Sequence, residues 1–242
     1  DLASGYINGN DIISLRDHHR SHADIIEFSN EEFYGGDLRV ATNYDNLKFV
    51  DLNANGICWV DVSGKTSRPA SGGAENEIEA REVIKEIAKL IIDRKYPGTI
   101  GVVTPFRAQA NLIRKLVNDN TELSSKLINN DFLVDTVHKF QGDERDVMIF
   151  SPVVSKNMPI GALGFLRNNG NLFNVAITRA RAMLLVVGDL KTISKCEVTY
   201  LAHFAKYVQN LSEKREKEVV NKIVDLGPEY PTVSEPEKVS EW

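Results

Sequence analysis

Short, continuously apolar stretches alternate with segments of helical periodicity along this chain, and this alternation restricts the possible folds more than any other feature. Strands that are apolar on both faces are typical of a parallel sheet, because helices cover such a sheet on both sides. Crossovers between parallel strands are right-handed, so the sequence predicts a doubly wound α/β layer. The predicted strands are Ile57–Val62, Thr99–Pro105, Phe132–Val137, Asp146–Val154 and Met183–Asp189.

Helical patterns fill the intervals between these strands. The clearest one follows Asn76, which lies three residues before Glu79, the spacing of a capping box at a helix start. Apolar residues then recur at helical spacing as far as Arg94. A further short strand is expected at residues 11–15. Helices are predicted over residues 22–33, 77–94, 106–117 and 173–181.

Composition divides the chain into a large body and a short tail. The 242 residues are 42% hydrophobic and 26% charged, a balance typical of a globular domain rather than of a disordered chain. Residues 212–242 carry eight of the acidic and five of the basic residues, together with three prolines. We therefore expect one domain over residues 1–211, followed by a charged helix and a loosely held tail over residues 212–242.

Several classes of protein are excluded by what the sequence lacks. No apolar run approaches the roughly 20 residues that a membrane helix needs. The opening residues, DLASGYINGN, have neither the basic start nor the apolar stretch of a signal peptide. Cys58 and Cys196 form no CxxC pair and suit reduced thiols. We expect a cytoplasmic protein with no membrane partner and no metal ligands, and the lack of an initiator methionine suggests an excised fragment.

One segment imitates a phosphate-binding loop without completing it. Gly64-Lys65-Thr66 matches the end of the pattern G-x-x-x-x-G-K-[ST], but Trp59 stands where the first glycine is required. The segment also runs into a long loop, residues 64–74, whereas a phosphate-cradling nest of amides needs a helix directly after the loop. Any nucleotide chemistry of this domain must therefore act on a nucleotide that is held elsewhere.

Four segments carry a family resemblance. They are SLRDHHRSHADIIEFSNEEFYGG, IGVVTPFRAQ, TVHKFQGDERDVMIFSPV and NVAITRARAMLLVVGD, and the resemblance spans roughly residues 12–190. These segments resemble the motifs of superfamily 1 helicases, in the order that the motifs take in the second RecA-like domain. The form FQGDERD is similar to that of the nonsense-mediated-decay helicases and their bacterial relatives. The resemblance implies a RecA-like parallel sheet with helices on both faces, the fold of P-loop NTPases without its own P-loop.

The resemblance also implies a set of nucleotide-contacting residues. Arg179 corresponds to the arginine finger of the family, and Arg20 corresponds to its second phosphate-contacting arginine. A guanidinium suits this role because it stays charged and can bond two oxygen atoms at once. For Arg179 and Arg20, the alternatives are a surface ion pair or a stem that packs against a helix face. For Glu144 the alternative is an exposed acid paired with Arg145 or Lys139, and for His19 it is a histidine at a helix entry with no nucleotide contact. Gln141 and Gly142 are expected near the cleft between motor domains, and Glu144 is expected to accept a hydrogen bond from the ribose hydroxyl. His19 stands where the family often has a base-stacking tyrosine. Arg181 either has a structural role or assists at the nucleotide.

A second set is expected to contact single-stranded nucleic acid. Ligands of open α/β sheets bind at the carboxyl ends of the strands, where helix N-termini attract phosphate. Small polar side chains there can bond phosphates without reading sequence. For Thr104 and Arg107, an ordinary helix cap and a surface arginine are equal alternatives. For His138, the alternative is a loop histidine whose hydrogen bonds are satisfied. The candidates are Thr104, Arg107 and Gln109 after one strand, and Thr136 and His138 after another.

The expected function is that of the second motor domain of an ATP-dependent helicase or translocase. ATP and Mg²⁺ would be held mainly by a first RecA-like domain of the same polypeptide, and the partner would be single-stranded DNA or RNA. This chain alone is expected to be inactive, and a prokaryotic origin is expected. The alternative is a degenerate helicase-like module that binds nucleic acid or a partner without ATPase activity. A self-contained small-molecule enzyme is disfavoured because no nucleophile–base pair can be found in the sequence.

Overall fold

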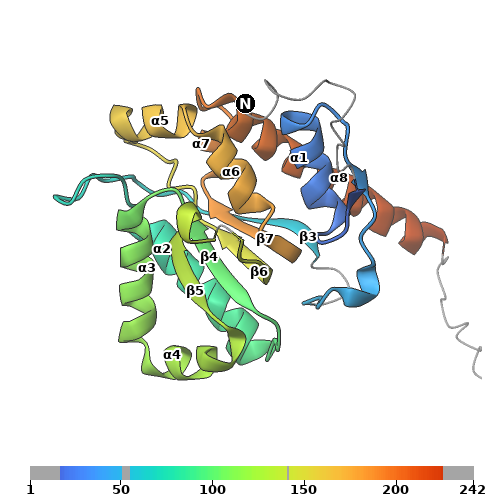
Figure 1. Cartoon of the computed structure of the whole chain (residues 1–242), viewed down its shortest axis with the longest axis horizontal. Helices are drawn as coiled ribbons and strands as arrows, with labels where there is room; N and C mark the ends of the chain where they lie inside the picture. The colour runs from blue at the N-terminus through green and yellow to red at the C-terminus, as the bar shows by residue number, and fades with distance from the viewer. Residues whose placement is uncertain (1–16, 51–54, 141, 226–242) are drawn as a thin grey trace, which may run out of the picture. The chain divides into compact units, whose positions relative to one another are not determined.

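The computed structural model describes residues 17–50, 55–140 and 142–225, with side chains as far as residue 217. Its centre is a five-stranded sheet in the order β3-β7-β6-β4-β5, and every neighbouring pair is parallel (Figure 1). This confirms the predicted parallel α/β fold. The strands are β3 (Gly56–Asp61), β4 (Ile100–Thr104), β5 (Leu133–Thr136), β6 (Arg145–Phe150) and β7 (Ala180–Gly188).

The sheet is buried on both faces, which explains why its strands are continuously apolar. Along β6, Met148 and Phe150 join one apolar cluster, whereas Val147 and Ile149 join the other. The first cluster takes side chains from α1 (Ala23–Phe33), α6 (Gly170–Ile177) and the start of α8 (Thr199–Asp225). The second takes them from α2 (Glu77–Ala88), α3 (Arg107–Asp119) and α4 (Thr121–Leu127). Alternate residues of one strand therefore pack against helices on opposite sides of the sheet.

Smaller elements complete the described part of the chain. A parallel pair, β1 (Asp17–His18) with β2 (Arg39–Val40), flanks α1. A π-helical turn, Lys89–Asp93, extends α2, so that the predicted helix over residues 77–94 is nearly complete. The remaining helices are α5 (Ile160–Arg167) and α7 (Leu190–Ile193), with 3-10 turns at Tyr44–Asn46, Ile128–Asn130 and Val137–Phe140.

Side chains cap two helix starts, of which only the cap by Asn76 was predicted from the sequence. The side chain of Asn76 accepts a hydrogen bond from the amide of Glu79 and so caps α2. The side chain of His22 accepts one from the amide of Asp24 at the start of α1. Each bond satisfies an amide that has no partner within the helix.

Two predicted boundaries are wrong. The helix predicted over residues 173–181 ends at Ile177, and β7 already begins at Ala180. The amide of Arg145 donates to the carbonyl of Arg179 (3.0 Å). The Arg179 carbonyl therefore bonds to the chain next to β6 in the sheet instead of to a further turn of the helix. The last helix, expected only after Ser212, begins at Thr199. The predicted strand at residues 11–15 and the proline-containing end, residues 226–242, lie outside the described residues.

The chain separates into two compact units, residues 1–208 and 209–242. The boundary predicted between residues 211 and 212 falls within α8 and stays a prediction. In the described part of the chain, no helix has both the length and the apolar character needed to cross a membrane.

Candidate functional site

The parallel sheet places the two predicted groups of residues at opposite edges. Glu144 directly precedes β6, and Arg179 directly precedes β7, so both belong to the edge formed by the amino ends of the strands. Thr136 ends β5, and Arg107 is the third residue after β4, so both belong to the edge formed by the carboxyl ends. The nucleotide-contacting and nucleic-acid-contacting candidates are thus separated by the length of the strands.

At the amino edge, the side chain of Arg20 forms an ion pair with Glu144, which lies 124 residues further along the chain. The Arg20 side chain is 60% exposed, so the pair remains open to solvent. The Glu144 carboxylate therefore pairs with neither Arg145 nor Lys139, the two partners that the sequence suggested. Beside this pair, burial and the neighbouring Arg20 guanidinium lower the pKa of His18.

His19 lies on the same edge and is exposed. Its Nδ1 atom is 3.1 Å from the carbonyl oxygen of Ala41, so Nδ1 donates to that oxygen and Nε2 is left for other contacts. This bond orients the ring from the end of β2. Contact of the ring with a nucleotide base stays a prediction.

The Arg179 side chain extends from the turn between α6 and β7. Its Nε atom donates to the carbonyl of Val175 in the last turn of α6 (3.2 Å). Neither terminal nitrogen forms a hydrogen bond or an ion pair with another described residue, so the predicted alternative of a surface ion pair is not observed there. A half-buried guanidinium held by its Nε, with its two terminal nitrogens open, can bond two oxygen atoms of an incoming anion.

Arg181 has a different environment because it lies within β7. Its NH1 nitrogen is 3.6 Å from a carboxylate oxygen of the buried Asp146, whose other oxygen accepts from the amide and the hydroxyl of Thr99. These contacts favour the structural role for Arg181. Its predicted contact with nucleotide is not tested by this geometry.

The segment just before β6 requires a glycine. Gly142 has φ +83°, in the left-handed region that other residues adopt only under strain, and it is exposed. Gln141 lies outside the described residues. The glycine turn brings the chain from the 3-10 turn that contains His138 to Glu144.

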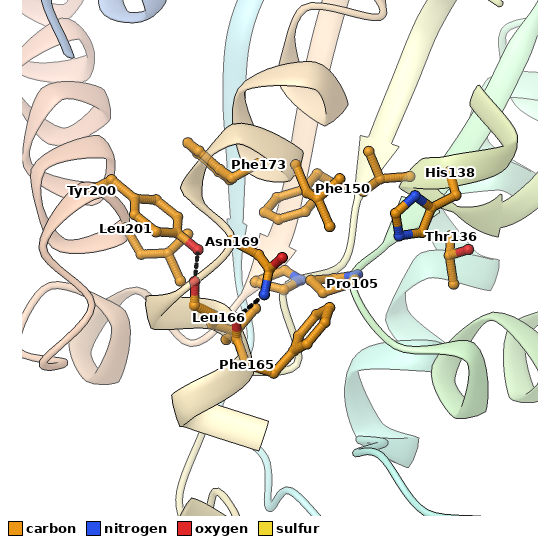
Figure 2. A pocket seen from close by; sticks show the side chains of 13 residues that line it. Pro105, Thr136, His138, Phe150, Phe165, Leu166, Asn169, Phe173, Tyr200 and Leu201 are labelled. Atoms are coloured by element: carbon orange, nitrogen blue, oxygen red, sulfur yellow. Dashed lines mark hydrogen bonds between the residues drawn. The ribbon is translucent and has the colours of Figure 1, made fainter. Parts of the chain in front are cut away.

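At the carboxyl edge, Thr136 and His138 line a narrow apolar cavity (Figure 2). Val137 and Phe140 are buried and anchor the 3-10 turn, which leaves His138 exposed. His138 forms no hydrogen bond with any residue in the described ranges, so it is not the satisfied loop histidine of the alternative. Pro105 and Phe165 form another part of the cavity, which Figure 2 shows opposite His138.

Two of the residues predicted to contact nucleic acid are buried in this structure, so their contacts stay predictions that the exposed surface does not support. Gln109 is completely buried, where its amide nitrogen donates to the carbonyl of Asn76 (3.2 Å) and the hydroxyl of Ser151 (3.0 Å). Its amide oxygen accepts from the Asn76 amide (2.9 Å). Thr104 is also completely buried, and its hydroxyl accepts from the amide of Phe106 (3.4 Å). Helix α3 turns this side of its first turn towards the core. Arg107, by contrast, is exposed as expected.

Three residues near these edges were not predicted from the sequence as functional. Phe165 and Arg68 line the carboxyl edge, but neither lies in a motif that would distinguish it from other surface residues. Glu79 was recognised only as part of a helix cap, yet it is completely buried. Its Oε1 atom accepts hydrogen bonds from the Ser151 hydroxyl (2.5 Å) and the Val153 amide (2.9 Å). Burial raises the pKa of Glu79 to about 8, and the nearby Asp189 carboxylate adds to the rise.

The segment that imitates a phosphate-binding loop is occupied by internal contacts. The amide of Thr66 donates to the carbonyl of Lys156 (2.8 Å), and the Thr66 hydroxyl donates to the carbonyl of Val153 (2.6 Å). The next helix begins only at Glu77. These donors are therefore not available for a phosphate.

Comparison with known proteins places this geometry in context. The model of a family described as "AAA domain" matches residues 4–191. The chain is 34% identical over 189 residues to Regulator of nonsense transcripts 1 of Caenorhabditis elegans, which covers 75% of this chain and 17% of that protein. It is 29% identical over 216 residues to DNA polymerase alpha-associated DNA helicase A of Saccharomyces cerevisiae, covering 81% of this chain and 30% of that protein.

A third relative comes from an archaeon. The chain is 27% identical over 218 residues to an uncharacterized ATP-dependent helicase of Methanocaldococcus jannaschii, covering 84% of this chain and 30% of that protein. The chain thus spans less than a third of the length of each of these three relatives.

Proposed function

Because the chain belongs to the AAA-domain family of superfamily 1 helicases, we propose that it is the second motor domain of an ATP-dependent helicase or translocase. The observation that carries this proposal is the separation of two polar sites to opposite edges of one sheet. Arg20, Glu144 and Arg179 lie at the amino edge, and His138 and Arg107 lie at the carboxyl edge. A motor domain needs such an arrangement, since it must contact a nucleotide and a nucleic-acid strand at the same time.

The amino edge suits a nucleotide that is bound by another domain. Phosphoryl transfer spreads negative charge over the γ-phosphoryl oxygens, and a guanidinium from a neighbouring domain stabilises that charge, an effect worth ~10³–10⁵ in rate. Arg179 fits this role because its two terminal nitrogens are open while its Nε is held by α6. ATP and Mg²⁺ would be held mainly by a first RecA-like domain of the same polypeptide, because the donors of Thr66 are already in use here.

The Arg20–Glu144 pair fits the same site. Both side chains keep solvent access, so phosphate can compete for the Arg20 guanidinium and a ribose hydroxyl can donate to Glu144. An exposed ion pair contributes only about 0–1 kcal/mol, so separating it costs little. The pair would therefore keep both side chains near their working positions before nucleotide arrives.

The carboxyl edge suits single-stranded DNA or RNA. The exposed His138 and the half-buried Thr136 can bond phosphates there without reading sequence. One short segment, residues 137–144, joins this edge to the amino edge, since it carries His138 at one end and Glu144 at the other. A shift of the nucleic-acid strand and a change at the nucleotide would both act on this segment, which supports coupling between the two sites.

The test is mutation of the proposed finger in the longer protein. We expect Arg179→Ala to reduce nucleic-acid-stimulated ATP hydrolysis by ~10³-fold or more, about 4 kcal/mol, while ATP binding changes little. The reason is that the transition-state charge falls on oxygens that only the finger reaches, whereas the ground-state nucleotide is held elsewhere. Arg179→Lys should recover little activity, because an ammonium cannot make the forked contact.

The matched control is Arg167→Ala, which removes an exposed arginine paired with Glu197 at the end of α5. This variant should hydrolyse ATP at the wild-type rate. Turnover by Arg179→Ala within a few-fold of wild type would contradict the finger assignment. ATP hydrolysis would then not depend on Arg179, and the catalytic role proposed for this domain would be wrong. A longer wild-type protein that hydrolyses no ATP would instead favour a degenerate module that binds nucleic acid without ATPase activity.

A further inference from the structure

An open groove lies next to the apolar cavity at the carboxyl edge and shares Pro105 and Phe165 with it. Three parts of the chain form its walls: the loop of residues 64–75, the start of α3 and the start of α5. Only the wall at the start of α3 belongs to a motif singled out in the sequence, IGVVTPFRAQ. The residues that line the groove are Arg68, Gly73, Pro105, Phe106, Arg107, Pro159, Gly161, Ala162 and Phe165.

The groove is cationic. Arg68 and Arg107 are both exposed, and neither forms an ion pair with a residue in the described ranges. No acidic residue is among those that line it. Helices α3 and α5 both begin here, and neither has a side-chain hydrogen bond at its N-cap residue, so their first amides add to the positive potential. An anion is therefore the ligand that this surface favours.

The loop that carries Arg68 is held in place rather than extended into solvent. Backbone hydrogen bonds in both directions join Ser67 and Glu75 (2.8 and 3.0 Å), which closes the loop at its base. The amide of Thr66 binds the carbonyl of Lys156, on the segment that leads into α5. The base of the loop is thus anchored to the segment before α5, and the loop contributes Arg68 to the groove that Arg107 also lines.

An aromatic surface accompanies the positive charge. The Phe165 side chain is 39% exposed, and its ring lies 5.8 Å from the ring of Phe106, centroid to centroid, at an interplanar angle of 51°. Figure 2 shows the Phe165 ring projecting from α5 beside Pro105. Proteins that bind single strands without sequence preference combine a cationic track for the backbone with aromatic rings on which bases stack.

We propose that this groove binds single-stranded nucleic acid, with Arg68 and Arg107 neutralising backbone phosphates and the ring of Phe165 stacking on a base. The inference rests on the proposed function and extends its nucleic-acid track from Thr136 and His138, across Phe165, to the 64–75 loop. Arg68 and Phe165 are the residues that it adds.

The experiment measures fluorescence anisotropy of labelled oligothymidine and oligouridine with the 242-residue chain at several salt concentrations. An abasic oligonucleotide of the same length serves as a third ligand. Arg68→Ala should weaken binding of all three ligands and reduce the slope of log affinity against log salt by about 0.7, one phosphate contact of a single strand. Phe165→Ala should weaken binding of the two base-containing ligands about five-fold or more and leave the abasic ligand unchanged.

Two exposed controls match these changes. Arg81→Ala removes an exposed arginine of α2 that pairs with Glu77, and Phe49→Ala removes a ring that is 36% exposed. Neither residue lines the groove, so both controls should bind as wild type does.

The outcomes separate this inference from the proposed function. If Arg68→Ala and Phe165→Ala bind all ligands like the wild type while His138→Ala loses affinity, the groove is not part of the track, and the proposed function remains. Equal losses for Phe165→Ala with abasic and base-containing ligands would overturn the stacking role. Absence of any binding by the wild-type chain at low salt would overturn the groove proposal, whereas the proposed function would still be judged by ATP hydrolysis in the longer protein.

Discussion

Replacement of Glu79 by glutamine tests the buried polar cluster behind the carboxyl edge. Glu79 is completely buried, and its Oε1 atom accepts from the Ser151 hydroxyl and the Val153 amide. Glutamine keeps an oxygen that can accept both bonds and is almost the same size. The Glu79→Gln variant should therefore keep the fold and differ from the wild type mainly in having no proton to lose.

The size of the effect follows from the pKa. Burial raises the pKa of Glu79 from its ordinary value of 4.5 to about 8, so the folded chain holds one more proton than the unfolded chain between these two values. The contribution of Glu79 to stability is fully present below pH 4.5 and is lost as the pH rises towards 8, at about 1.4 kcal/mol per pH unit. Between pH 5 and pH 9 this amounts to a loss of about 4 kcal/mol.

The assay is urea unfolding of both proteins, followed by circular dichroism at several values between pH 5 and pH 9. The free energy of unfolding of Glu79→Gln should rise relative to that of the wild type by about 4 kcal/mol across this range, with an unchanged urea m-value. All other titrating groups are common to both proteins and cancel in the comparison. Glu77→Gln is the control, because Glu77 lies on the same helix but is exposed and pairs with Arg81. Its difference from the wild type should stay below about 0.5 kcal/mol.

A difference between Glu79→Gln and wild type that stays constant within about 1 kcal/mol from pH 5 to pH 9 would refute the reasoning. Glu79 would then be ionised in the fold at neutral pH. In that case, the hydrogen bonds from Ser151 and Val153 would outweigh the cost of burial.

Two further predictions concern the motor. The 242-residue chain alone should show no ATP turnover above a buffer blank, and its nucleic-acid affinity should fall with salt at a shallow slope, on the order of −1 to −3, because few phosphates are neutralised. In the longer protein, Arg20→Ala should slow nucleic-acid-stimulated hydrolysis and also weaken ATP binding more than Arg179→Ala does, since Arg20 can reach phosphate in the ground state. Nucleotide titration beside single-turnover hydrolysis measures both, and equal ATP affinities of the two variants would contradict the role assigned to Arg20.

Much of this architecture was determined by the sequence itself. The continuous apolar runs predicted the five parallel strands, because a strand covered on both faces leaves no polar alternation. The Asn76 cap was predicted because the unpaired amides of a first helical turn bond to side chains that lie three positions apart in the sequence. Trp59 in place of a glycine indicated that a P-loop is missing, because that loop depends on local backbone geometry. These features are visible in the composition and spacing of residues along the chain, and so the sequence alone predicts them.

Only the tertiary structure decided which side chains face the solvent and which of them meet. Gln109 and Thr104 stand in a motif that suggested exposed contacts, yet the packing of α3 against the sheet buries both. The pairing of Arg20 with Glu144 joins residues 124 positions apart, and the early end of α6 at Ile177 follows from ladder formation with β6. The periodicity of apolar residues predicts that an element has a buried face, but it does not predict which distant element covers that face. These outcomes depend on long-range packing, which no local pattern contains.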